Sequence, residues 1–152
     1  MTGAGIVRLS WISTAAFAVA ATVAAAVPER AARPVAVFDC VLFLIGVGAF
    51  LLAFARAVGR SRTEEVEILG VYFLGGGVAP REVRRSLLGA FAAQVVVAVV
   101  TASIRPYTAV AFGILVPMLG LGLAGLWGAT YGRFPERHSV ARQGDRADWP
   151  TA

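Results

Sequence analysis

The chain has 152 residues, of which 58% are hydrophobic and 15% are charged, and its mean hydropathy is +0.74. An ordinary soluble domain has about 25% charged residues, so this composition excludes a soluble globular class and predicts an all-α membrane protein. The formal net charge is +5, every basic residue is arginine, and the arginines flank apolar runs. This arrangement favours anionic lipid headgroups as a partner and argues against nucleic-acid binding. The single cysteine, Cys40, excludes an internal disulfide and a multi-cysteine metal site.

The first apolar run covers residues 9–27 and carries no charge. A spanning helix needs about 20 residues, so this run is long enough to cross a membrane. The alternative is a cleaved secretory signal peptide, with Arg8 as its positive region and Ala24 and Ala26 at its cleavage site. We favour a retained helix, because the run exceeds the usual apolar region of a signal peptide and Pro28 would follow the cut almost directly.

Three further apolar runs follow the first. Residues 28–34 read PERAARP, and the two prolines predict a short connector because proline disfavours helix at the residue before it. Pro117 lies within the last run and is expected to kink it. The predicted spans are residues 9–27, 35–55, 87–104 and 108–132, arranged as two hairpins joined by a cytoplasmic loop at 56–86. Residues 1–132 are thus expected to form a four-helix transmembrane domain, and residues 133–152 a polar cytoplasmic tail.

The arginines are divided unevenly between the two ends of these spans. The side of the short connectors has only Arg30, Arg33 and Arg105. The side of the N-terminus, central loop and tail has Arg8, Arg56, Arg60, Arg62, Arg81, Arg84, Arg85, Arg133, Arg137, Arg142 and Arg146. Positive residues near span ends stay on the cytoplasmic side. Both termini are therefore expected in the cytoplasm, with the protein in a bacterial inner (plasma) membrane.

The central loop contains an apolar string at residues 68–74. It is too short to span a membrane and too apolar to stay in water, so we expect it in the interface or across the cytoplasmic helix ends. Ser61 followed by Glu64 fits a capping box, which predicts a short helix over about residues 63–69. Pro80 suits the first turn of the third span.

A glycine run and three arginines lie just before that third span. Backbone amides of a glycine run that feeds a helix N-terminus can bind phosphate. The residues concerned are Gly75, Gly76, Gly77, Arg81, Arg84 and Arg85. The complete P-loop pattern and the dinucleotide fingerprint are both absent. We therefore favour a flexible turn with interfacial arginines, and we retain a contact with an anionic lipid phosphate or a nucleotide as the alternative.

The fourth run has small residues at every fourth position, namely Gly120, Ala124, Gly128 and Gly132. Such a ridge lets a neighbouring backbone approach closely, and in lipid this contact must supply the attraction between helices. We call these four residues the small-residue ridge. Internal packing is the favoured interpretation, and contact with another subunit or a second copy of the chain is the alternative.

Two polar side chains fall inside predicted spans. Asp39 lies five residues into the second span, where we expect it to meet water or to pair with Arg33 or Arg105 rather than to relay protons. A carboxylate within a span is otherwise costly and suggests a function. Gln94 lies near the middle of the third span and is expected to hydrogen-bond between helices.

No catalytic pattern appears in or near the spans, and His138, the only histidine, lies in the tail. We therefore expect a non-enzymatic protein without metal or cofactor. The favoured function is an accessory or assembly subunit of a larger inner-membrane complex, for example one that handles envelope lipids. The alternatives are a small oligomeric transporter or channel, and a regulatory membrane protein that binds lipid phosphate.

The hairpin–loop–hairpin layout, the absence of lysine and the Trp127-Gly128 end of the last run resemble four-pass membrane proteins of actinobacteria. This likeness extends over the whole chain but includes no diagnostic motif. No functional residue is carried over from it.

Overall fold

The computed structural model describes residues 2–104, 106 and 108–135, and every regular element in these residues is helical. In chain order they are α1 (Gly3–Ala26), α2 (Pro28–Arg60), α3 (Ile68–Phe73), α4 (Arg81–Ile104), the 3-10 helix η1 (Ala109–Leu115) and α5 (Pro117–Tyr131). Four stretches are long and apolar enough to cross a membrane: α1, α2, α4, and η1 together with α5. The predicted all-α class with four candidate spans is confirmed. The tail from residue 136 onward lies outside the described residues.

The chain reverses between α1 and α2 at Val27 alone, so the predicted connector at 28–34 is wrong. Pro28 occupies the first turn of α2, where its missing N–H costs no hydrogen bond, and Glu29 suits the positive end of the helix dipole. Pro34 lies inside the helix. With 33 residues, α2 is about 50 Å long and exceeds the ~30 Å hydrocarbon core of a bilayer.

The other predicted boundaries also change. α1 begins at Gly3 rather than at residue 9, and the Thr2 hydroxyl caps it by accepting the Gly5 N–H at 3.2 Å. α2 continues to Arg60, so the central loop covers residues 61–80 rather than 56–86. α4 begins at Arg81, directly after Pro80. Polar residues mark the limits of apolar spans well, but helices continue through them into the interface.

The predicted capping box at Ser61 is wrong. Ser61 ends α2, and its hydroxyl donates to the Val58 carbonyl at 2.8 Å instead of capping a new helix. The short helix α3 begins only at Ile68. It ends at Leu74, which takes a left-handed conformation with φ 52°. Gly76 and Gly77 continue the turn with φ of 61° and 82°, values that glycine adopts without steric cost.

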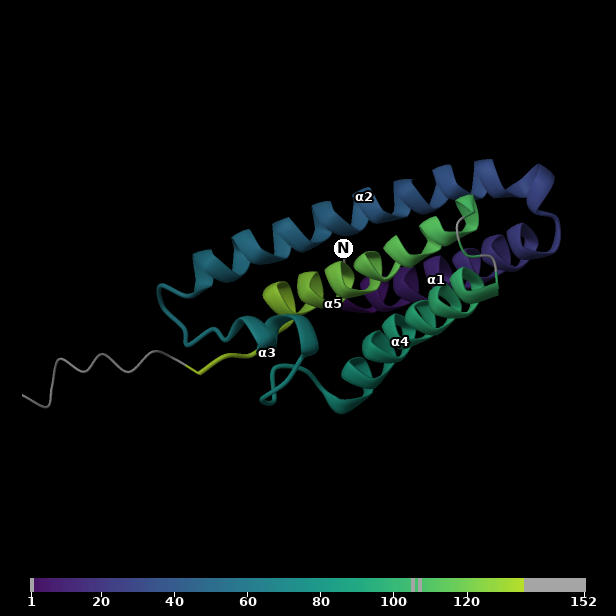
Figure 1. The fold of residues 1–152 in the computed structure, drawn as a ribbon. Helices are drawn as coiled ribbons and strands as arrows, with labels where there is room; N and C mark the ends of the chain where they lie inside the picture. The colour runs from purple at the N-terminus through teal and green to yellow at the C-terminus, as the bar shows by residue number, and fades with distance from the viewer. Residues whose placement is uncertain (1, 105, 107, 136–152) are drawn as a thin grey trace, which may run out of the picture.

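Helix α5 lies between α2 on one side and α4 on the other, with α1 alongside (Figure 1). The most extensive contacts join α2 to α5 and α1 to α4, so each half of the chain packs mainly on the other half. Trp11 of α1 supports the second pair by donating its indole N–H to the Ser86 hydroxyl of α4 at 2.9 Å. The predicted hairpins, α1 with α2 and α4 with α5, therefore pack against each other instead of forming two separate units.

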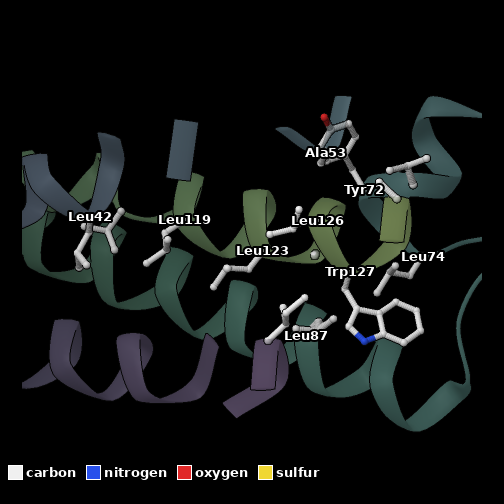
Figure 2. Packing of buried hydrophobic residues seen from close by; sticks show 14 of the residues in the cluster. Leu42, Ala53, Tyr72, Leu74, Leu87, Leu119, Leu123, Leu126 and Trp127 are labelled. Atoms are coloured by element: carbon white, nitrogen blue, oxygen red, sulfur yellow. The ribbon is translucent and has the colours of Figure 1, made fainter. Parts of the chain in front are cut away.

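The core follows α5 from end to end. Leu119, Leu123 and Trp127 are buried on this helix, and Leu42 of α2 and Leu87 of α4 pack into the same cluster (Figure 2). Large apolar side chains stay exposed on the outer faces of the bundle, as is expected where lipid replaces water; examples are Val19, Leu44 and Val96.

The fourth span is divided into two helical segments. Residues Ala109–Leu115 form a 3-10 helix, and the α-helix begins at Pro117, which has no N–H to donate. The predicted kink at Pro117 is thus a change of helix type. The N-terminus of α5 consequently lies inside the bundle, where its free N–H groups must find acceptors.

Candidate functional site

The small-residue ridge lies inside the protein, but its members contact different elements. A Cβ at Gly120 would lie 3.1 Å from the Cα of Phe91 in α4. A Cβ at Gly128 would collide with the Val71 carbonyl of α3. Ala124 is fully buried between them, and Gly132 follows the end of α5 and abuts Val78. The ridge therefore packs within the chain and is not free on the surface.

Another close helix contact, between α2 and α5, involves glycines outside the ridge. A Cβ at Gly46 of α2 would lie 2.5 Å from the backbone nitrogen of Leu119 and 2.7 Å from its Cα. On the opposite side of this contact, a Cβ at Gly122 of α5 would collide with the Gly46 carbonyl. Sequence reasoning missed this pair because it followed only the four-residue spacing. Gly46 in the middle of an apolar run was visible in the sequence, but nothing there distinguished it from Gly48, which makes no such contact.

Gln94 is fully buried and joins three helices. Its Nε2 donates to the Thr14 hydroxyl of α1 at 2.8 Å, and its Oε1 accepts the Gly120 N–H of α5 at 3.1 Å. The Thr14 hydroxyl in turn donates to the Ser10 carbonyl at 2.7 Å. Gly120 lies in the first turn of α5, so Gln94 accepts one of the N–H groups that the break at Pro117 leaves without an intrahelical partner. Gln94 thus makes the expected hydrogen bonds between helices, and one of them caps the buried N-terminus of α5.

Asp39 is more deeply enclosed than expected. Its side chain is 1% exposed, and no donor in the described residues reaches its Oδ1. A Cβ at Gly113 of η1 would lie 3.6 Å from Asp39 Oδ2 and 3.2 Å from the Phe17 ring of α1. The expected contact with water is therefore wrong, and no ion pair joins Asp39 to Arg33. The proposed partner Arg105 lies outside the described residues.

Arg60 connects the end of α2 to the end of α5. Its guanidinium donates to the carbonyls of Ala129 at 3.1 Å and Gly132 at 3.0 Å, and it forms an ion pair with Glu64 at 2.8 Å. It also lies 5.0 Å above the ring of Phe134. A cation that binds the last carbonyls of a helix satisfies free acceptors and complements the helix dipole. This role was not predicted, because nothing in the sequence distinguishes Arg60 from the other loop arginines.

Helix α3 has one buried and one exposed apolar face. Tyr72 is buried; its ring stacks on Phe50 with centroids 4.4 Å apart, and its hydroxyl donates to the Phe50 carbonyl at 3.0 Å. Burial also raises the pKa of the Tyr72 hydroxyl above its ordinary value. On the outer face Leu69 is 72% exposed and Phe73 is 45% exposed. The inner face thus fixes the helix, and the outer face presents apolar side chains.

The glycine run and the three arginines do not form one site in the structure. Gly75 and Gly76 line a hollow together with Glu65, Glu67 and Arg133, and because the two carboxylates outnumber the one guanidinium, this hollow disfavours an anion. The arginines line a separate open hollow of about 370 Å³ with Leu88; they are Arg81, Arg84 and Arg85. The three arginines are exposed, and the glycines add no binding group to them.

Within the described residues, no group of three or more histidine, cysteine or carboxylate side chains is close enough to hold a metal ion. The polar groups of this part of the chain include the Gln94 network, the Arg60 cluster, the Arg56–Thr130 hydrogen bond at 2.9 Å and the enclosed Asp39. No protein-family model matches the chain, and comparisons with curated proteins and with solved structures find no similar protein.

Proposed function

We propose that this protein is a non-enzymatic accessory or assembly subunit of a larger complex in a bacterial inner membrane. The four candidate spans support the membrane location. The observation that carries the proposal is the outer face of α3, which holds Ile68, Leu69 and Phe73 exposed while the inner face of the same helix is fixed in the bundle. An exposed apolar surface outside the spans is typical of a site that binds a protein or a membrane surface, and we favour a protein because the opposite face of α3 is packed against the bundle.

The surroundings of this face suggest the chemistry of the partner. Exposed arginines lie in the same inter-span segment and at the start of α4: Arg62, Arg81, Arg84 and Arg85. Glu65 and Glu67 are also exposed, directly before α3, so the apolar face has charges of both signs near it and is complemented by an apolar patch with a rim of mixed charge. The favoured partner is therefore a membrane subunit with such a patch next to its own spans. The ridge on α5 is excluded as the contact surface because α3 and α4 already cover it.

The alternative functions receive less support from the described residues. A channel or transporter needs a polar path, but α5 fills the centre of the bundle with leucine, alanine and glycine. A phosphate-binding regulator needs convergent donors, but the glycine run shares its hollow with two glutamates and Arg133, and Arg81, Arg84 and Arg85 line a different hollow. The docking function does not depend on either arrangement.

Replacing Leu69 with glutamate is expected to remove the partner from the purified complex without unfolding the protein. The side chain is exposed, so the charge costs the isolated chain less than about 0.5 kcal/mol of unfolding free energy. Copurification from membranes in mild detergent, with thermal unfolding of the isolated protein, measures both effects. Thr63→Glu is the control, because it adds the same charge at an exposed polar position of the same loop. Equal recovery of the partner with both variants would contradict the proposal.

We further propose that both termini lie in the cytoplasm. Arg8, Arg60 and Arg81 lie at one end of the bundle, and Arg30 and Arg33 lie at the other. Positive residues are retained on the cytoplasmic side. In a Cys40-free background, the Glu29→Cys variant is expected to react with an impermeant maleimide added outside the cell. The Thr63→Cys variant is expected to react only after the membrane is opened. The reverse pattern would overturn this orientation.

A further inference from the structure

We propose that Asp39 is a proton-binding site inside the membrane-spanning bundle, a role independent of the docking function of α3. Its carboxyl group is enclosed, and its Oδ1 receives no hydrogen bond from the described residues. An ionised carboxylate without a partner is costly inside a bilayer, whereas the protonated acid carries no charge. The geometry therefore favours a bound proton.

No described charged side chain faces this carboxyl group. The charged residues of α2 on that side are Glu29, Arg30 and Arg33, and Arg33 lies six residues away, about 9 Å along the helix. The only charged residue of α1 is Arg8, near the opposite end of the bundle, and η1 and α5 have none. The charged residues of α4 lie in its first two turns, far from η1. Arg105 and Tyr107 lie outside the described residues, so the test must also detect pairing with them.

The elements around Asp39 explain how a carboxyl group fits there. Gly113 has no side chain, which leaves room for Asp39 Oδ2 and for the Phe17 ring against the η1 backbone. Phe17 lies near the middle of α1, so the carboxyl group is well inside the bundle. The fourth span changes from 3-10 to α-helix immediately after this segment. A proton that enters or leaves Asp39 therefore changes the charge beside the irregular part of that span.

The test is labelling of the intact protein in membranes with dicyclohexylcarbodiimide, an apolar reagent that reacts with protonated carboxyl groups. The acid O–H adds across one C=N bond: the oxygen joins the central carbon and the proton goes to nitrogen. The adduct then rearranges to a stable N-acylurea that keeps every atom of the reagent. Peptide mass mapping at neutral pH is expected to find the label on Asp39, with labelling falling as the pH is raised. Glu65 and Glu67 are exposed and serve as internal controls that stay unlabelled.

Asp39→Asn has nearly the shape of the neutral acid, so it should fold normally and lose the label at this position. The infrared carbonyl band of a protonated carboxyl group should be present in the unmodified protein and absent in this variant. If the variant does not fold, the label and the band in the original protein still decide the question. Absence of both would show an ionised Asp39, as expected for pairing with Arg105, and would overturn the proposal. Protection from labelling by Na⁺ at constant pH would also overturn it, because it would identify a metal-cation site.

Discussion

Replacing Gly46 with alanine is expected to prevent α2 from packing on α5. The added Cβ would lie 2.5 Å from the Leu119 nitrogen, and backbone atoms cannot move aside as a flexible side chain does. Overpacked cores lose about 1–3 kcal/mol, and we expect a loss at the top of this range because the whole length of one helix would be displaced. The apparent unfolding midpoint in mild detergent, followed by tryptophan fluorescence, measures the effect.

Gly48→Ala is the matched control for this experiment. It lies two residues further along the same helix, and a Cβ at that position would meet nothing within 4 Å. Alanine favours helix over glycine, so this variant should be as stable as the original protein or slightly more stable. A similar loss in both variants would mean that glycine is required in α2 for a reason other than contact with α5.

Replacing Gln94 with leucine is expected to produce the second large loss. The Gly120 N–H and the Thr14 hydroxyl would each lose a partner inside the bundle. A single hydrogen bond between membrane helices contributes about 0.6 kcal/mol on average. A buried group left without a partner costs about 1–3 kcal/mol. We expect a loss in that range, because the Gly120 N–H would stay buried at the helix terminus without an acceptor. Thermal unfolding in the same detergent provides the measurement.

Thr101→Val tests whether the loss is specific to the connection between helices. Thr101 is also buried on α4, but its hydroxyl donates only to the Val97 and Ala98 carbonyls of its own helix. Those carbonyls already accept backbone hydrogen bonds, so the change should cost less than about 0.5 kcal/mol. If Gln94→Leu costs no more than Thr101→Val, Gln94 does not hold the three helices together.

The membrane class and the four candidate spans could be predicted because they depend only on composition and on the length of uncharged runs. The helix ends were predicted poorly. Pro28 was predicted to begin a connector, although proline is equally suited to the first turn of a helix. Ser61 and Glu64 fitted a capping box, but α2 had not yet ended, so the Ser61 hydroxyl bonds backward to Val58. Local patterns could not show how far a neighbouring helix continues.

The candidate site illustrates the same limit. Gln94 was expected to bond between helices, but its position against Gly120 depends on the break at Pro117 and on the packing of α4. Asp39 was placed near the interface by counting residues along its own helix. Its actual surroundings are set by Phe17 and Gly113, which are distant in sequence. Residues brought together from three helices leave no spacing pattern that a single sequence could reveal.

The packing of the ridge also changes where a partner can bind. Every member of the ridge is covered by the protein's own helices or loop, so small residues at four-residue spacing do not mark an external contact here. Among the described residues outside the spans, the exposed large apolar side chains are Val27, in the turn between α1 and α2, and the outer-face residues of α3. The docking function therefore depends on whether Ile68, Leu69 and Phe73 meet a protein or only lipid.

The most direct measurement is photo-crosslinking in native membranes with a photoreactive amino acid at Leu69. We expect a protein adduct of discrete mass, which is lost when Phe73→Asp is introduced beside the probe. The same probe at Ile45, an exposed apolar position in the middle of α2, should form adducts with lipid alone. Lipid adducts alone at Leu69, as at Ile45, would contradict the docking function and show that α3 rests in the membrane interface.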